Sequence, residues 1–297
     1  MSASAELRDE ALLEPIEDVS TGDPERRRFL FSPWHLVLIP LAIVMLIPMI
    51  WMIITSFETL SETRHFPPIL IPNSLQWQNY TAVLQQAPFA RWFMNTLIVT
   101  VVVVAGNLLF CSLAGYAFAR IKFFGRDVVF ILVLATLMIP FQVIIIPTFI
   151  IVRKLGLIDT LGALIVPNLA GAFGIFLLRQ FFRSLPIELE EAARIDGASR
   201  LGVLFKIVLP LSGPVLATVA VITFLWTWND FLWPLVTLYS PNNMTLQLGL
   251  TTFQGAHSTN THLLMAANVM SIVPVLFLFV FAQRFFIRGI ATSGLKG

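Results

Sequence analysis

Between two apolar runs the sequence reads Ser184-Leu185-Pro186-Ile187-Glu188-Leu189-Glu190-Glu191-Ala192-Ala193-Arg194-Ile195-Asp196-Gly197-Ala198-Ser199. Pro186 suits the first position of a helix, where its missing N–H costs no hydrogen bond. Three glutamates near that start are favoured by the helix dipole, and Gly197 can adopt the left-handed conformation that closes a helix. We therefore expect a helix over about residues 186–196, roughly 16 Å long, too short and too charged to cross a bilayer.

The rest of the chain is poor in charge. Of its 297 residues, 57% are hydrophobic and only 12% are charged, and the mean hydropathy is +0.83. Because soluble domains carry about 25% charged residues, this composition indicates a membrane protein and excludes an ordinary soluble enzyme. A net charge of +2 gives no reason to expect a nucleic-acid partner. Cys111 is the only cysteine, which excludes an internal disulfide and a thiolate metal cage.

Six apolar segments meet or approach the roughly 20 residues that a helix needs to span lipid. Only the fifth contains a charged residue, Asp230. Since unpaired backbone groups are costly in hydrocarbon, each segment is predicted to be a helix. The sequence thus predicts an all-α membrane protein with six transmembrane helices, at about 34–54, 93–118, 128–151, 161–178, 215–236 and 263–281.

Lysine and arginine are distributed unevenly among the connections. Fifteen of the 19 lie on one side of the bilayer if that side holds the N-terminus, residues 119–127, residues 179–206 and the C-terminus. Because cytoplasmic connections carry the excess of positive charge, both termini are predicted to be cytoplasmic and the 186–196 helix to lie along the inner face.

The sequence divides the chain into three predicted parts. Residues 1–30 hold eight acidic residues and little apolar periodicity, which predicts a disordered cytoplasmic tail. Residues 31–285 form the transmembrane domain, including the helix at 186–196. Residues 286–297 form a cytoplasmic C-terminal tail.

The 186–196 helix has two interpretations. Ala192 and Ala193 carry almost no side-chain bulk, so another protein can approach the backbone closely, and the flanking acids can pair with basic residues there. Alternatively, the helix is simply solvated, or lies at the lipid interface. The clustering of acids argues against a position on anionic lipid.

A longer pattern resembles a known family. Glu191-Ala192-Ala193, three residues, Gly197, nine residues and Ile207-Val208-Leu209-Pro210 match the spacing of the EAA signature of ABC importer permeases. The likeness extends from about Asn79 to the C-terminus. The Asn229-Asp230-Phe231 stretch after Trp226 and Trp228, and the ending from Arg288 to Gly297, look like the carbohydrate-uptake branch. Within that branch the chain is similar to the smaller permease of maltose-type importers.

The resemblance implies a division of labour at the cell membrane. This multi-pass chain would pair, within membrane lipid, with a second homologous permease. The pair would sit on a dimer of ATP-binding cassette subunits that bind ATP and Mg²⁺, and an extracytoplasmic binding protein would deliver a mono- or oligosaccharide. The 186–196 helix would be the coupling helix, and the residues that the resemblance assigns to ATPase coupling are Glu190, Glu191, Ala192, Ala193, Asp196 and Gly197. The loop at 237–262 is similar in position to one that probes the binding protein, and the tail beyond Arg284 would reach the ATPase.

The residues give no sign of catalysis or of a cofactor in this chain. No G-x-x-x-x-G-K-[ST] loop occurs, and the dipeptide Gly-Lys is absent, so no phosphate-cradling motif is present. The four histidines are scattered, with no metal-ligand spacing. ATP hydrolysis, if it drives the protein, is expected on a partner.

Asp230 is the clearest candidate for a solute path, because charged groups at membrane depth usually face a cavity. Hydrogen-bonding side chains beside aromatic faces suit a sugar. The candidate path residues are Thr227, Asn229, Asp230, Trp226 and Trp228, accompanied by Thr223 and Trp233. The alternative is an interfacial aromatic belt, with Asp230 facing water or a helix partner.

Three other functions stay open. The same kind of importer can carry glycerol phosphate or glycerophosphodiesters, although the spans contain no basic residue for an anion. A membrane-integrated lipid-modifying enzyme would need clustered acids or histidines. An ion-driven secondary transporter predicts inverted repeats, and it leaves the 186–196 helix unexplained.

Overall fold

The structure, a computed structural model, describes residues 34–255 and 259–293, so the tail predicted at 1–30 lies outside the described residues. The chain divides into two units, Met1–Ile47 and Pro48–Gly297. Helix α1 (His35–Ser56) begins in the first unit and ends in the second.

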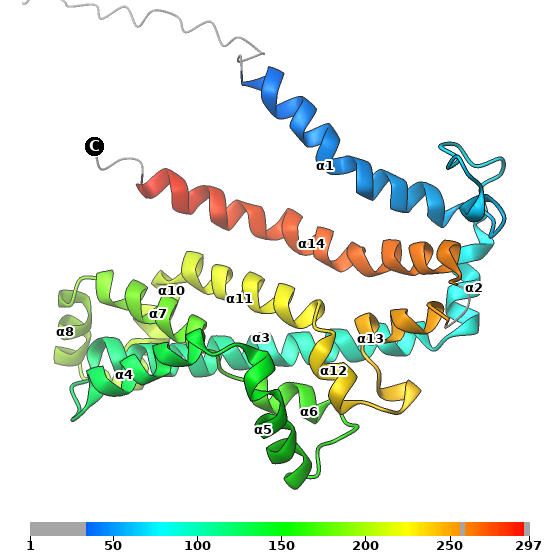
Figure 1. Cartoon of the computed structure of the whole chain (residues 1–297). Coiled ribbons are helices and arrows are strands. Elements are labelled where there is room, and N and C mark those ends of the chain that lie inside the picture. The colour runs from blue at the N-terminus through cyan, green and yellow to red at the C-terminus, as the bar shows by residue number, and fades with distance from the viewer. Residues whose placement is uncertain (1–33, 256–258, 294–297) are drawn as a thin grey trace, which may run out of the picture. The chain divides into compact units, whose positions relative to one another are not determined.

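The described residues are mostly helical, and among them no strand forms beyond an isolated bridge between Gln254 and Thr259. Figure 1 shows the helices of the second unit. They are α2 (Gln78–Gln86), α3 (Phe89–Arg120), α4 (Arg126–Ala135), α5 (Phe141–Lys154), α6 (Gly162–Ile165), α7 (Ala172–Ser184), α8 (Glu188–Ile195), α9 (Arg200–Val203), α10 (Leu209–Leu211), α11 (Gly213–Trp228), α12 (Leu232–Thr237), α13 (Leu246–Leu250) and α14 (Thr261–Ser293). A π-helical segment, Leu204–Val208, lies between α9 and α10, and α14 remains helical beyond residue 286, where the sequence predicts a tail.

Four helices are long and apolar enough to cross a membrane, and six spans result if each of two bent pairs counts as one. The four are His35–Ser56, Phe89–Arg120, Gly162–Ser184 and Thr261–Gln283. They coincide with predicted spans one, two, four and six. The third predicted span falls within the first bent pair, and the fifth overlaps only the second helix of the other pair.

The first pair bends within the predicted third span, 128–151, whereas the bend of the second pair, at Ser212, lies before the predicted fifth span, 215–236. Arg126–Met138 meets Phe141–Lys154 at 107°, because Pro140 disfavours a helical conformation in Ile139, which is extended at ψ 115°. The second pair, Arg200–Leu211 with Gly213–Trp228, is bent by 83°. The expectation of a helix through 215–236 is wrong, since α11 ends at Trp228 and α12 starts at Leu232.

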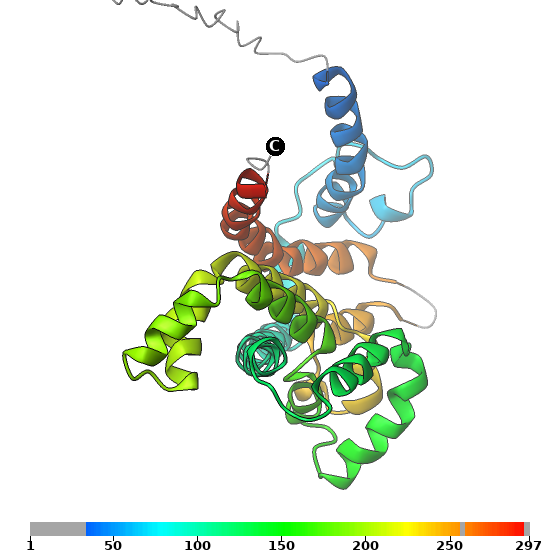
Figure 2. The same ribbon diagram turned by 90° about the vertical axis from the view of Figure 1, so that its left-hand side faces the viewer.

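Helix α3 forms the centre of the second unit and packs against α7, α11 and α13. Figure 2 looks nearly along its axis. Helix α7 approaches α3 closely because glycines stand at the contact. A Cβ on Gly115 would lie 3.1 Å from the backbone nitrogen of Arg179, and a Cβ on Gly174 would lie 2.9 Å from Cys111 Sγ. Such small residues let membrane helices approach closely without a hydrophobic driving force.

At the end of α3 remote from α8, three side chains hold the loop at 237–262. Trp92 Nε1 donates to the Pro241 carbonyl at 2.7 Å. Asn95 Nδ2 donates to the carbonyls of Asn242 and Met244 at 2.8 and 2.9 Å. Thr96 Oγ1 accepts from the Leu246 N–H at 2.7 Å. Asn95 thus hydrogen-bonds to this loop and not to a neighbouring transmembrane helix.

Gly249 provides a test of this attachment. A Cβ at that position would overlap the indole ring of Trp92. Gly249→Ala is therefore expected to displace Trp92 and destabilise the fold by about 1–3 kcal/mol, the usual cost of overpacking. Thermal unfolding in detergent measures the change, and Gly213→Ala, at a site with nothing within 4 Å, is the matched control. Equal midpoints for the two variants would contradict the attachment.

Candidate functional site

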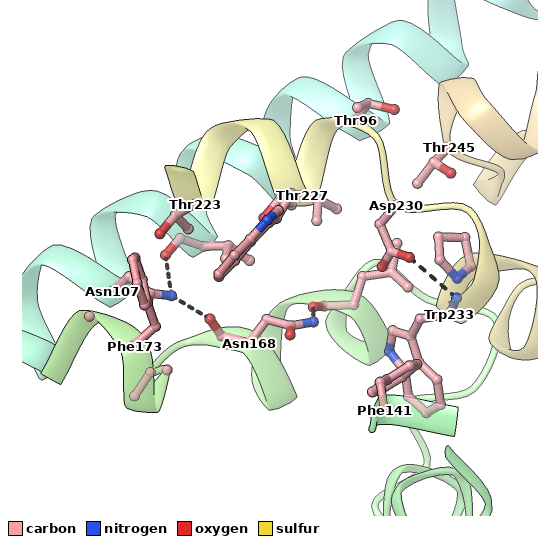
Figure 3. A pocket seen from close by; sticks show the side chains of 18 residues that line it. Thr96, Asn107, Phe141, Asn168, Phe173, Thr223, Thr227, Asp230, Trp233 and Thr245 are labelled. Atoms are coloured by element: carbon pink, nitrogen blue, oxygen red, sulfur yellow. Dashed lines mark hydrogen bonds between the residues drawn. The ribbon is translucent and has the colours of Figure 1, made fainter. Parts of the chain in front are cut away.

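A cavity of about 400 Å³ opens beside the middle of α3. Figure 3 shows side chains from several helices and from the segments between them converging on it. The lining residues are Thr96, Val99, Val103 and Asn107 of α3, Phe141 of α5, Leu164 of α6, Asn168, Ala170 and Gly171, Phe173 and Gly174 of α7, Thr223, Trp226 and Thr227 of α11, Asp230, Trp233 and Pro234, and Thr245.

Asp230 is the only charged residue among those that line the cavity. It follows the last turn of α11, where the helix break turns its carboxylate toward the interior (Figure 3). Its Oδ1 accepts one long hydrogen bond, 3.4 Å, from the Trp233 N–H. The carboxylate therefore keeps acceptor capacity for a molecule in the cavity.

Two aromatic pairs border the same space. Phe173 and Trp226 have ring centroids 5.6 Å apart, and Phe141 meets Trp233 edge to face at 5.8 Å. Trp233 is fixed by its Nε1, which donates to the Ala163 carbonyl at 2.9 Å. Trp226 is 63% exposed and presents an open face. An apolar ring face beside a carboxylate and hydroxyls can bind a polyhydroxylated molecule through its C–H surface and its hydroxyls.

The predicted path residues separate into two groups. Trp226, Thr227 and Asp230 line the cavity, as do the accompanying Thr223 and Trp233. Trp228 does not: it is 1% exposed, stacks on Phe224 and donates from Nε1 to the Ser271 carbonyl at 3.2 Å. Asn229 is exposed and bonds the Leu225 carbonyl. Residues two apart on a helix point to nearly opposite sides, so Trp226 and Trp228 cannot share one face.

Several lining residues were absent from the sequence prediction. Thr96, Phe141, Phe173 and Thr245 come from distant elements, and no local pattern distinguishes them from other apolar or hydroxyl residues. Asn107 Nδ2 donates to the Asn168 carbonyl at 2.7 Å. It also lines the cavity.

Helix α8 lies beyond the other end of α3 (Figure 1) and is a second candidate site. It occupies Glu188–Ile195, within the interval where the sequence predicts a helix. Glu188, Glu191, Ala192 and Ile195, spaced three and four apart, share one face, and all four are exposed. Ile195, which the sequence prediction omitted, is 87% exposed. This exposed face combines acids, a small residue and an apolar tip.

The opposite face of α8 turns inward, which corrects two expectations. Glu190 is 6% exposed and its Oε1 lies 2.7 Å from Arg120 Nε, so it cannot reach a partner protein. Ala193 is half-buried and packs on the cluster around Leu178 and Phe182. Of the two predicted close-packing alanines, only Ala192 is on the open face.

The end of α8 is closed as the sequence suggests. Gly197 has φ +85°, in the left-handed region. The Ala198 N–H donates to the Ala193 carbonyl at 2.9 Å and the Gly197 N–H to the Arg194 carbonyl at 3.1 Å, which is the Schellman arrangement. Asp196 is exposed at this turn.

Asp159, between α5 and α6, fastens the 237–262 loop at a second point. Its carboxylate accepts from the Ser240 hydroxyl and from the N–H groups of Ser240 and Tyr239, each N–H at 2.9 Å. The Ser240 hydroxyl and N–H contribute most and lower the pKa of Asp159 to about 2. No local pattern in the sequence singles out this residue.

The low pKa of Asp159 predicts how the loop responds to acid. Because the folded pKa lies below the unfolded value, the ionised carboxylate stabilises the loop above about pH 4, and this is lost as pH falls toward about 2. Protection of the Tyr239 and Ser240 amides, corrected for intrinsic exchange rates, should stay constant from about pH 7 to 5. Asp159→Asn should lower it at neutral pH, and equal protection in that variant would refute the role.

Among the residues that the structure describes, no three His, Cys, Asp or Glu side chains gather as metal ligands. The cavity lies beside the middle of α3, and α8 lies beyond the C-terminal end of the same helix (Figure 1).

Comparisons with known proteins show what the chain is similar to. The family described as "binding-protein-dependent transport system inner membrane component" matches residues 109–292. The arabinooligosaccharides transport system permease protein AraQ of Halalkalibacterium halodurans is 41% identical over 86% of this chain and 93% of its own length. The sn-glycerol-3-phosphate transport system permease protein UgpE of Pectobacterium atrosepticum is 34% identical, covering 91% of this chain and 99% of its own.

A solved structure supports the same likeness. It is the crystal structure of a bacterial ABC transporter involved in the import of the acidic polysaccharide alginate. One of its chains superposes with a TM-score of 0.77 at 27% sequence identity, covering 86% of this chain and 99% of that one.

Proposed function

The chain belongs to the family of binding-protein-dependent transport system inner membrane components, and on that premise we propose that it passes a neutral sugar, delivered by an extracytoplasmic binding protein, through the cavity beside α3. It is a multi-pass membrane protein and an ABC transporter permease. The proposal adds the solute class, the path and the partners.

The residues that line the cavity are the reason for proposing a neutral solute. It holds one carboxylate, two aromatic pairs and several hydroxyl and amide groups, and no lysine or arginine. An anion in this space would meet Asp230 with no compensating cation, which is unfavourable at low dielectric. Relatives named for glycerol-3-phosphate and for an acidic polysaccharide show that the fold also serves anions. Those solutes remain the alternative function, and the absence of basic groups in the lining disfavours it.

The exposed face of α8 supports an ATPase partner. Glu191 supplies an acid for a basic residue of the ATP-binding subunit, Ala192 permits close approach, and Ile195 fits an apolar pocket. Asp196 and Gly197 shape the turn that follows. ATP and Mg²⁺ bind to those separate subunits in this proposal, and the chain itself is not an enzyme.

Orientation follows from charge. In the second unit, the connections at the α8 end of the bundle carry eight basic residues: Arg120, Lys122, Arg126, Arg179, Arg183, Arg194, Arg200 and Lys206. The connections at the other end carry four: Arg64, Arg91, Arg153 and Lys154. Under the positive-inside rule the α8 end faces the cytoplasm, and both termini do so as well. The 237–262 loop then faces the binding protein, and a second homologous permease completes the path.

A solute panel tests this proposal. The chain is reconstituted in proteoliposomes with the second permease, the ATPase dimer and the binding protein. Labelled arabinotriose, maltotriose, sn-glycerol-3-phosphate and an alginate trisaccharide are offered in turn. We expect ATP-dependent uptake of a neutral oligosaccharide and none of either anion. Uptake of an anion with exclusion of both neutral sugars would overturn the solute class and favour the alternative.

A further inference from the structure

The C-terminal end of α3 contacts α8 through a buried polar cluster. This cluster, called the α8 anchor, consists of Tyr116 and Arg120 of α3 and Glu190 of α8. Arg120 Nε lies 2.7 Å from Glu190 Oε1, and the Tyr116 hydroxyl donates to Glu190 Oε2 at 3.0 Å. Arg120 also donates from Nη2 to the Leu185 carbonyl at 2.6 Å, just before α8 begins. Both the helix and the segment that leads into it are therefore held by α3.

The α8 anchor is protected from solvent. The side chains of Arg120 and Glu190 are 12% and 8% exposed. Removing one member of a buried pair leaves an uncompensated charge, so such a contact resists separation strongly. The exposed face of α8 and Glu190 lie on opposite sides of the same short helix. A partner protein that pushes or pulls on the exposed face therefore loads the contacts between Glu190 and α3.

The other links from α8 to the bundle are the apolar packing of Ala193 on the cluster around Leu178 and Phe182 and the chain itself on either side of α8. Beyond Gly197 the chain enters α9, the π-helical Leu204–Val208 and then the 83° bend before α11. Before α8 the chain leaves α7 through Leu185, whose carbonyl Arg120 already holds. A π-helical segment and a bend are points at which the backbone can change direction, so a movement of α8 can be lost there before it reaches α11.

Helix α3 continues without interruption from the anchor to the far end of the unit. It runs over Phe89–Arg120, 32 residues with no proline. Midway it contributes four residues to the cavity wall. At its start Trp92, Asn95 and Thr96 hold the 237–262 loop. One rigid element thus contacts α8, the cavity and the loop.

We propose that Tyr116, Arg120 and Glu190 are positioning residues that convert a displacement of α8 into a movement of α3 as a single body. The movement reaches the cavity wall and the 237–262 loop together, so the two ends of the path change in step. This inference rests on the proposed function, because it requires an ATPase that moves α8.

Variants at the anchor test the inference in the reconstituted complex. The set consists of Tyr116→Phe, Glu190→Gln and the double variant Arg120→Gln/Glu190→Gln, in which no lone charge remains. The control is Arg183→Gln, which removes the same charge from an exposed side chain near the same end of the bundle. Basal ATP hydrolysis, complex assembly and stimulation by the binding protein loaded with the stimulating oligosaccharide of the panel are measured for each.

We expect the double variant to assemble and to keep basal hydrolysis within about twofold, while maximal stimulation falls about tenfold or more. The binding-protein concentration for half-maximal stimulation should stay unchanged, since the 237–262 loop is intact. Loss of packing alone would lower assembly and basal hydrolysis as well. Tyr116→Phe, which removes one hydroxyl, should fall between the double variant and Arg183→Gln.

Two outcomes would overturn the inference, and they are distinguishable. Full stimulation of an assembled double variant, with a responsive wild type, refutes the anchor alone and leaves the proposed function standing. A wild-type complex that no solute of the panel stimulates removes the proposed function, and the inference falls with it.

Discussion

Glu191→Lys is expected to reduce ATP-driven solute uptake by at least about thirtyfold while the chain still folds. Glu191 is exposed on α8, and the contacts that hold that helix to α3 are made by Glu190. Losing one partner of a hydrogen-bonded charge pair at an interface costs about 2–5 kcal/mol, and each 1.4 kcal/mol is a factor of ten. A lysine in the first turn also opposes the helix dipole.

Uptake into proteoliposomes and co-purification of the ATPase measure this effect. Ser184→Lys, which places a lysine at the exposed end of α7 outside the proposed docking face, is the control and should retain uptake. Glu191→Gln should be intermediate, because it loses the attraction without adding repulsion. Wild-type uptake and ATPase retention in Glu191→Lys would show that the exposed face of α8 is not the docking surface.

Asp230→Asn is expected to lower uptake about ten- to hundredfold and to leave complex assembly intact. A hydrogen bond to a charged group is worth about 1.5–3 kcal/mol, and the amide keeps the shape while it loses the charge. The Asp230 carboxylate has one long hydrogen bond, from the Trp233 N–H, and is otherwise available to a sugar hydroxyl. Trp226→Ala should act in the same direction by removing the open ring face.

The neighbouring Asn229 supplies the control. Its side chain is exposed and bonds the Leu225 carbonyl of its own helix, away from the lining residues. Asn229→Ala should therefore keep uptake within about twofold of the wild type, in line with surface substitutions away from special features. Equal uptake in Asp230→Asn and Asn229→Ala would remove Asp230 from the solute path.

The apolar runs predicted the helices that could cross the membrane because lipid leaves few alternatives to a helix. Their breaks were harder to predict. Pro147 and Pro274 lie inside α5 and α14, whereas Pro140 coincides with a 107° bend. The local sequence does not distinguish these three prolines. Whether a proline breaks the helix depends on whether neighbouring helices supply partners for the backbone groups that it frees. The break after Trp228 has no proline within it.

Side-chain direction accounts for the remaining differences. Helical periodicity alone separates Trp226 from Trp228, and it also places Glu190 away from Glu191 and Ala192. Which of these faces is buried depends on α3, because Arg120 lies seventy positions earlier in the chain than Glu190. The cavity also depends on the tertiary fold, because its lining combines residues of six α-helices with residues of the segments between them. Only the stretch around Asp230 has a local sequence pattern that points to it.

The cavity, α8 and the 237–262 loop all contact α3. Under the proposed function, α3 is therefore the element that the solute, the ATPase and the binding protein have in common. Under this proposal the chain supplies the solute path and the helices that move, and the ATPase subunits supply the free energy of ATP hydrolysis.

The most direct test compares solute accumulation by two preparations of proteoliposomes. One contains the purified chain alone, and the other contains the full complex with ATP inside and the loaded binding protein outside. We predict accumulation against a gradient only in the second, and its loss when ATP is replaced by a non-hydrolysable analogue. Accumulation by the chain alone would contradict the claim that a separate ATPase drives this protein.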